Sequence, residues 1–137
     1  MISKITPENA LKFMIGLLIL VILFHISIFI QIIPYTIVWA GKLNTVQEMW
    51  VFESVSISIN ILLITLLLLK GNYIKHTLSD KLLNLILWIF VLIFSLNSIG
   101  NLMSETILEK VIFTPLTLIS AFLIWIIVKN KKVENSL

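Results

Sequence analysis

The stretch of sequence that most constrains the fold is 50–69, WVFESVSISINILLITLLLL, which is followed by Lys70. About 20 mainly apolar residues are enough for a helix to cross the hydrocarbon core of a bilayer. This stretch nevertheless contains Glu53 near its start and Asn60 near its middle. Because an ionisable side chain inside a membrane helix is costly, its presence points to a function. We therefore expect the rest of the chain to form further helices around the polar face of this one.

Three more apolar stretches are long enough to span a membrane, and the four predicted helices cover about 11–33, 46–70, 81–102 and 111–128. The mean hydropathy of +1.09 and the charged fraction of 12 % also indicate lipid surroundings, because soluble domains carry about twice that charge. The first stretch is too long for a signal peptide and has no small-residue cleavage site after it. We predict an all-α membrane protein in which residues 1–137 form one domain with four transmembrane helices in an up-down-up-down bundle.

The lysines of the chain fall mainly on one side of this predicted bundle. Eight of the ten basic residues belong to one side, and these are Lys4, Lys12, Lys70, Lys75, Lys81, Lys129, Lys131 and Lys132. Only Lys42 and Lys110 belong to the other side. Because lysine-rich ends stay in the cytoplasm, we expect a multi-pass protein of the bacterial inner membrane with both termini cytoplasmic. The chain has no Arg and little polar surface, so nucleic-acid binding is not expected.

Polar side chains are predicted to gather at one depth in the outer half of the membrane. An α-helix rises about 1.5 Å per residue. Measured from the lysine at the inner end of each helix, the residues about 20–25 Å away are His25, Glu53, Asn97 and Thr114. Each of these residues comes from a different helix, whereas the inner half is mostly Leu, Ile, Val and Phe. This asymmetry predicts a polar pocket in the outer half of the bundle.

Helical spacing supports the convergence of these residues. Glu53, Ser56 and Asn60 share one stripe of their helix, and Asn97 and Asn101 share a stripe of another. The predicted pocket comprises Glu53, Asn97, Asn101, Asn60, Ser56, His25, Gln31 and Thr114. The competing interpretation is structural, because Asn, Ser, Thr and His in membrane helices often only hydrogen-bond to neighbouring helices. Glu53 could equally be a wet residue at the membrane interface, where Tyr35, Trp39 and Trp50 are the predicted anchors.

Sequence motifs for catalysis and metal binding are not found. The chain has no Cys, no HExxH motif and no His pair four residues apart, so neither a metal site nor thiol chemistry is expected. No Ser-His-Asp arrangement, nucleophile elbow or glycine-rich phosphate loop occurs either. We therefore expect no cofactor, and no motif assigns an enzymatic reaction.

Four short segments resemble small uncharacterised bacterial four-helix integral membrane proteins, a family with no assigned activity. These segments are Trp39-Ala-Gly41-Lys-Leu43, Val51-Phe-Glu53-Ser-Val-Ser56, Ser95-Leu-Asn97-Ser-Ile-Gly-Asn101 and Phe113-Thr-Pro-Leu-Thr117. The resemblance covers nearly the whole chain and implies the same four-helix membrane fold. The chain is not similar in its main motif to small multidrug-resistance transporters, whose essential membrane Glu lies in the first helix and not, like Glu53, in the second.

Three functions remain open from the sequence. The first is a binding or accessory module whose polar pocket holds a lipid headgroup, a small amphiphile or a partner helix. The second is a proton-coupled small-molecule transporter, which would have to be a homo-oligomer because four helices are few for a pathway. The third is a lipid-modifying membrane enzyme in which Glu53 and His25 act as acid and base.

Overall fold

The computed structural model describes residues 5–129 and contains four long helices and no strand within this range. The helices are α1 (Pro7–Phe29), α2 (Val46–Lys70), α3 (Asp80–Leu102) and α4 (Thr114–Lys129). Two 3-10 turns, η1 (Tyr35–Ile37) and η2 (Trp39–Gly41), follow α1, and a π-helical turn, η3 (Glu109–Phe113), leads into α4. All four helical segments are long and apolar enough to cross a membrane. The predicted all-α fold with four membrane-spanning helices is thus confirmed, and the chain is a multi-pass membrane protein.

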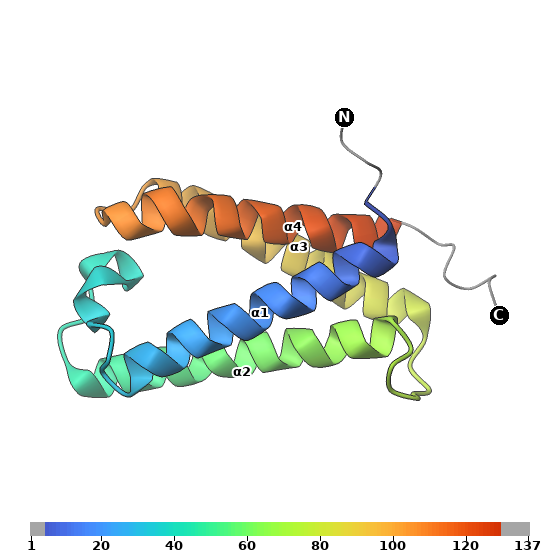
Figure 1. The fold of residues 1–137 in the computed structure, drawn as a ribbon, viewed down its shortest axis with the longest axis horizontal. Coiled ribbons are helices and arrows are strands. Elements are labelled where there is room, and N and C mark those ends of the chain that lie inside the picture. The colour runs from blue at the N-terminus through green and yellow to red at the C-terminus, as the bar shows by residue number, and fades with distance from the viewer. Residues whose placement is uncertain (1–4, 130–137) are drawn as a thin grey trace.

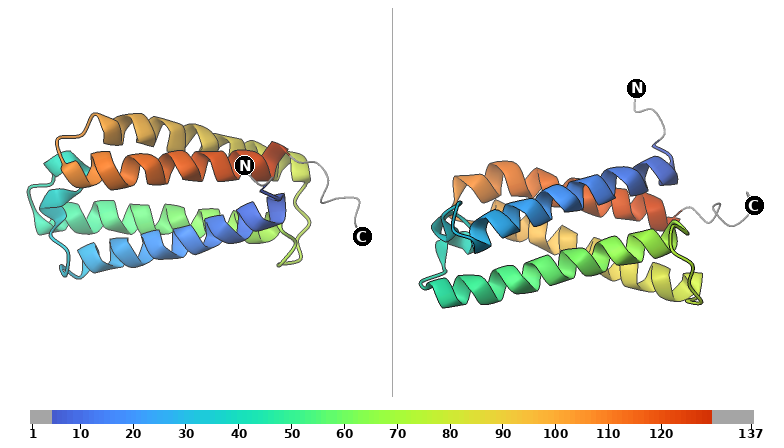
Figure 2. Two further views of the ribbon diagram at one scale, coloured as in Figure 1. Left: turned by 45° about the horizontal axis from the view of Figure 1, so that its top comes forward. Right: turned by 60° about the horizontal axis from the view of Figure 1, so that its bottom comes forward.

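Consecutive helices run in opposite directions along the bundle (Figure 1). The connections α1–α2 and α3–α4 lie at one end, which we call the outer end, and the α2–α3 connection lies at the other (Figure 1). The other end, called the lysine-rich end, carries Lys12, Lys70, Lys75, Lys81 and Lys129. The predicted lysines Lys4, Lys131 and Lys132 lie outside the described residues. Helices α1 and α2 form one pair and α3 and α4 another, and the segment with η1 and η2 lies between the two pairs at the outer end (Figures 1 and 2).

Hydroxyl side chains cap the N-terminal ends of three of the helices. Thr6, Thr45 and Ser79 each accept a hydrogen bond from the backbone N–H three residues later. Such caps satisfy backbone N–H groups that have no partner inside the helix. At α2, the Glu48 carboxylate also accepts from the N–H of Asn44, 2.9 Å away. The Thr-x-x-Glu signal therefore correctly places the start of α2 at Val46.

Helix α1 is shifted by four residues from its predicted range of 11–33. It begins at Pro7, directly after the Thr6 cap, and ends at Phe29. Beyond it Gln31 has a φ of 63°, a left-handed conformation that ends the helix before Pro34. The indole N–H of Trp50 donates to the carbonyl of Phe29 at 3.2 Å and satisfies one of the last free acceptors.

The predicted fourth helix, 111–128, starts as a π-helical turn and becomes α-helical only at Thr114. Pro115 has no backbone N–H, so it cannot bond to the carbonyl four residues earlier. The hydroxyl of Thr114 donates to the carbonyl of Glu109 at 3.2 Å. A side chain thus satisfies a backbone acceptor within the wider turn.

The apolar interior is divided into two clusters. The inner cluster joins all four helices, with Met14, Leu67, Leu87 and Ile124 fully enclosed among its members. The outer cluster consists of Ile28, Val38, Leu43 and Met49, with partly buried side chains that include Leu108 and Phe113 packed against it. No residue of α3 belongs to this outer cluster. The segment between α1 and α2 therefore supplies outer-half packing that α3 does not provide.

Three consecutive residues in this segment adopt a left-handed backbone. Trp39 and Ala40 have a φ of 54°, and Gly41 has a φ of 69°. Each non-glycine residue in this conformation costs about 1–2 kcal/mol. The turn must therefore be held by other contacts.

We expect Gly41→Ala to lower the free energy of unfolding by about 1 kcal/mol, because alanine lacks the freedom of glycine at positive φ. The added methyl group would meet only the Thr36 carbonyl oxygen at 3.6 Å, an ordinary contact, so the effect isolates the backbone term. Gly16→Ala in α1 is the control, since nothing lies within 4 Å of its added methyl group. Reversible unfolding in mixed micelles measures the free energy of unfolding of both variants. Equal changes in the two would contradict the expected backbone strain at position 41.

Candidate functional site

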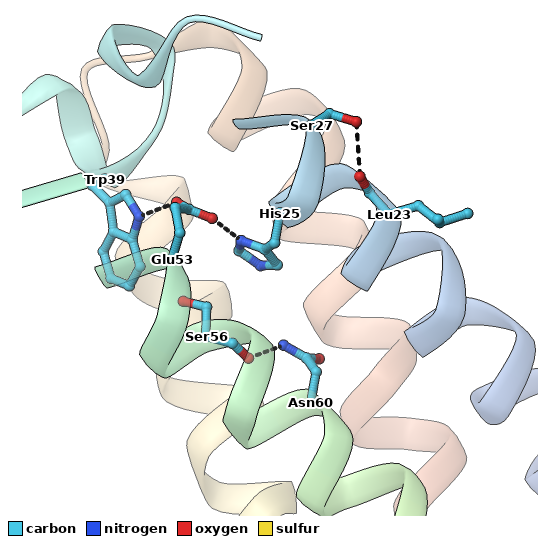
Figure 3. Close-up of polar contacts among 7 residues, drawn as sticks. All are labelled: Leu23, His25, Ser27, Trp39, Glu53, Ser56 and Asn60. Atoms are coloured by element: carbon cyan, nitrogen blue, oxygen red, sulfur yellow. Dashed lines mark hydrogen bonds and ion pairs between the residues drawn. The ribbon is translucent and has the colours of Figure 1, made fainter. Parts of the chain in front are cut away.

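The centre of the candidate site is Glu53, whose side chain is fully buried at 0 % exposure. Its Oε2 lies 2.5 Å from Nδ1 of His25 on α1. Its Oε1 accepts a hydrogen bond from the indole N–H of Trp39 at 2.8 Å. Figure 3 shows the two partners on opposite sides of the carboxylate. Glu53 on α2 therefore links this helix to α1 and η2 through hydrogen bonds. It is buried, and so it is not the water-exposed interfacial residue of the competing interpretation.

His25 is the only member of this trio whose second polar atom is left without a partner. The His25–Glu53 contact uses Nδ1 of the ring, and an imidazole Nδ1 that carries a proton donates to a carboxylate oxygen. The Nε2 atom makes no hydrogen bond within residues 5–129, and it is not among the buried unpaired atoms. The side chain as a whole is 18 % exposed. When the ring is neutral with its proton on Nδ1, Nε2 can accept a hydrogen bond. When the ring is protonated, Nε2 can donate one.

The left-handed turn at η2 positions Trp39 for its bond to Glu53. The rings of Trp39 and Phe52 lie 4.9 Å apart between centroids, so the indole also packs against the residue preceding Glu53. Trp39 was predicted as an interfacial anchor, and its partly exposed ring is compatible with that. Its polar group, however, points inward to the carboxylate (Figure 3).

A second buried carboxylate, Glu109 in η3, holds the next residue of the same turn. Its two oxygens each lie 3.1 Å from the backbone nitrogen of Ala40, which donates to them. The hydroxyl of Thr106 donates to Glu109 at 2.8 Å, and the hydroxyl of Ser104 also donates to it. The outer segment is therefore tied to both helix pairs, through Trp39 to Glu53 and through Ala40 to Glu109.

Ser56 and Asn60 lie below Glu53 on the same stripe of α2, as predicted, and both are half-buried. The amide nitrogen of Asn60 donates to the carbonyl of Ser56 at 2.7 Å (Figure 3). This bond stays within the helix and leaves the amide oxygen of Asn60 without a partner among the described residues. The stripe therefore extends the polar surface of the site toward the middle of the bundle.

The other predicted pocket residues are not joined to Glu53 by hydrogen bonds. Asn97 is exposed on α3, and its side chain makes no hydrogen bond within the described part of the chain. Asn101 is half-buried near the end of α3, and Gln31 is exposed beyond α1. Thr114 bonds to its own helix start. Of the predicted pocket residues, the structure thus joins His25 to Glu53, with Ser56 and Asn60 on the same stripe of α2, while Asn97 remains available to another molecule.

The residues that the sequence interpretation missed are Glu109, Ser104 and Thr106. Thr106-Ile-Leu-Glu109 has the same Thr-x-x-Glu spacing as Thr45-Val-Gln-Glu48, which correctly marked the start of α2. The signal could therefore have been used at the start of the last helical segment as well. The polar role of Trp39 has no such signal, because it depends on a chain reversal at the outer end.

Side chains suited to metal binding do not cluster within residues 5–129: no group of three or more His, Asp or Glu residues could hold an ion there. The His25–Glu53 pair supplies two groups, and both carboxylate oxygens are already bonded. The pair itself can form hydrogen bonds and exchange a proton.

The fold and the site together define a four-helix, multi-pass membrane protein with a buried carboxylate network in one half. No protein-family model, curated protein or solved structure matches the chain.

Proposed function

We propose that the chain is a binding or accessory module of the bacterial inner membrane, with both termini cytoplasmic. Its ligand is a lipid headgroup, a small amphiphile or a partner helix that contacts the outer half of the bundle. The observation that carries the proposal is the fully buried Glu53 with His25 and Trp39 on its two oxygens. Burying a charge costs several kcal/mol unless it is well paired, so such groups in membranes are retained mainly for function.

The orientation is supported by the lysines at the two ends of the bundle. Among residues 5–129, five lysines lie at the lysine-rich end, whereas Lys42 and Lys110 lie at the outer end. Short lysine-rich connections remain on the cytoplasmic side. The Glu53 network then lies toward the external face, where ligands from outside the cell or from the outer leaflet can reach it.

Ligand binding is supported by polar groups that the protein leaves unused. Nε2 of His25 and the amide of Asn97 have no partner within the described part of the chain, although both lie in membrane-spanning helices. Polar groups in hydrocarbon gain from any donor or acceptor that reaches them. A headgroup or a polar side chain from a partner helix would satisfy them.

The test is mass spectrometry of the intact protein after gentle extraction from its native membrane. We expect wild type to retain a bound species, and Asn97→Ala to retain about tenfold less because one hydrogen bond of roughly 1.4 kcal/mol is lost. Thr65→Ala is the control, since its exposed hydroxyl bonds only to the carbonyl of Ile61. A wild-type protein without bound species, together with wild-type behaviour of Asn97→Ala in cells, would refute the proposal.

A second candidate function is favoured by the direct bond between His25 and Glu53. Two titratable groups 2.5 Å apart form a unit that can take up and release a proton. Such a unit would serve an oligomeric proton-coupled transporter, or a lipid-modifying enzyme with the pair as base and orienting carboxylate. Proteoliposomes that show no proton flux dependent on Glu53, and a lipid profile unchanged by deletion of the gene, would argue against both.

A further inference from the structure

A groove of about 500 Å³ lies between α3 and α4, away from the Glu53 network. It is lined by Val91, Leu118, Ile119, Ala121, Phe122 and Trp125. Ala121 is buried and forms the floor, whereas Leu118, Ile119 and Phe122 are exposed. With about 1.5 Å per residue, the part formed by α4 extends from about 6 to 17 Å above Lys129. The groove therefore lies in the lysine-rich half, at the depth of the lipid chains of one leaflet.

A positive charge lies at one end of this groove. The ammonium group of Lys129 is 4.5 Å from the centroid of the Trp125 ring, and Trp125 is itself a lining residue. The side chain thus folds over the ring of a lining residue. Lys81, the second residue of α3, lies at the same end of the bundle and is also exposed, while the neighbouring Asp80 is paired with Lys70 at 3.5 Å. Both helices that form the groove therefore carry an exposed lysine at the lysine-rich end of the bundle, and Lys129 is the one that contacts the lining.

We propose that this groove binds an acidic phospholipid, with one acyl chain along the apolar lining and the phosphate at Lys129. The lining is aliphatic and aromatic, which suits a hydrocarbon chain better than a polar ligand. The volume lies within the range of ordinary ligand sites. The lysine adds the charge complementarity that selects an acidic headgroup over a zwitterionic one. This site is separate from the Glu53 network and does not depend on its function.

The experiment offers the full-length protein equal amounts of phosphatidylglycerol and phosphatidylcholine with identical chains, in detergent micelles, and counts bound lipid by native mass spectrometry. We expect wild type to retain about fivefold more phosphatidylglycerol, the ratio that one lysine near a headgroup supplies. Lys129→Gln should reduce this preference to near unity. Lys42→Gln removes a lysine from the outer end and should leave the preference unchanged.

Two groove variants test the position of the acyl chain. Ala121→Leu fills the floor and should reduce retention of both lipids, and Ile119→Trp fills the groove from its exposed rim if the buried substitution does not fold. Equal retention of the two lipids by wild type would overturn the proposal, as would equal effects of Lys129→Gln and Lys42→Gln. A dimer that excludes lipid from the groove, seen in the same spectra, would assign the groove to a second copy instead and would also overturn it.

Discussion

Glu53→Ala should lower the free energy of unfolding by about 3–5 kcal/mol, the usual cost of removing one partner from a buried pair. The variant leaves Nδ1 of His25 and the indole N–H of Trp39 without the fully buried carboxylate that pairs with both. It also removes the hydrogen bond that joins η2 to α2. Reversible unfolding in mixed micelles measures the loss.

Two variants control this prediction. Glu53→Gln keeps one oxygen for the indole N–H and replaces the other by an NH2 group, which Nδ1 of His25 can accept from in its other tautomer. It should therefore cost about 1–2 kcal/mol less than the alanine variant. Ser58→Ala removes an exposed hydroxyl that bonds to the carbonyl of Ser54 within α2, and it should be nearly neutral. If Glu53→Ala were as mild as Ser58→Ala, the carboxylate would not hold the outer half together.

Glu109→Ala should lower the free energy of unfolding by about 2–3 kcal/mol, because three donors lose a buried acceptor and each is worth about 1 kcal/mol. The donors are the N–H of Ala40 and the hydroxyls of Ser104 and Thr106. Hydrogen exchange should also accelerate at the amide of Ala40, since its bond crosses between the two helix pairs.

Glu105→Ala is the matched control for this second carboxylate. Glu105 lies in the same connection but is exposed, and surface changes of this kind stay within about 0.5 kcal/mol. The outer segment would not depend on Glu109 if both variants lost similar stability, or if exchange at Ala40 were unchanged.

The membrane fold could be predicted because it depends on local signals that repeat along the chain. Apolar length sets the number of helices, and Thr45 marks the start of α2 correctly. The start of α1 at Pro7 has a local signal in Thr6 and Pro7, but its end could not be predicted from the apolar run, because the residues up to Pro34 are as apolar as the helix itself. What ends α1 at Phe29 is a left-handed residue and a bond from Trp50 on another helix.

The candidate site could be predicted only in part for a similar reason. Helical rise placed His25 and Glu53 at similar depth, and this sufficed to propose the pair. Depth does not give the rotation of each helix around the bundle, and this rotation leaves Asn97 exposed and without a hydrogen bond to the pair. The roles of Trp39 and Ala40 depend on a chain reversal with three positive φ angles, and only Gly41 among these residues signals it.

The double-mutant cycle of Trp39→Phe with Glu53→Ala tests the central claim most directly, namely that a buried carboxylate joins the outer segment to the membrane helices. Each single variant and the double variant are unfolded under identical conditions, so changes in packing around the indole cancel. The account predicts a coupling of about 1.5–3 kcal/mol, as expected for a hydrogen bond to a charged group. Additivity to within about 0.5 kcal/mol would show that Trp39 and Glu53 act independently, and would contradict it.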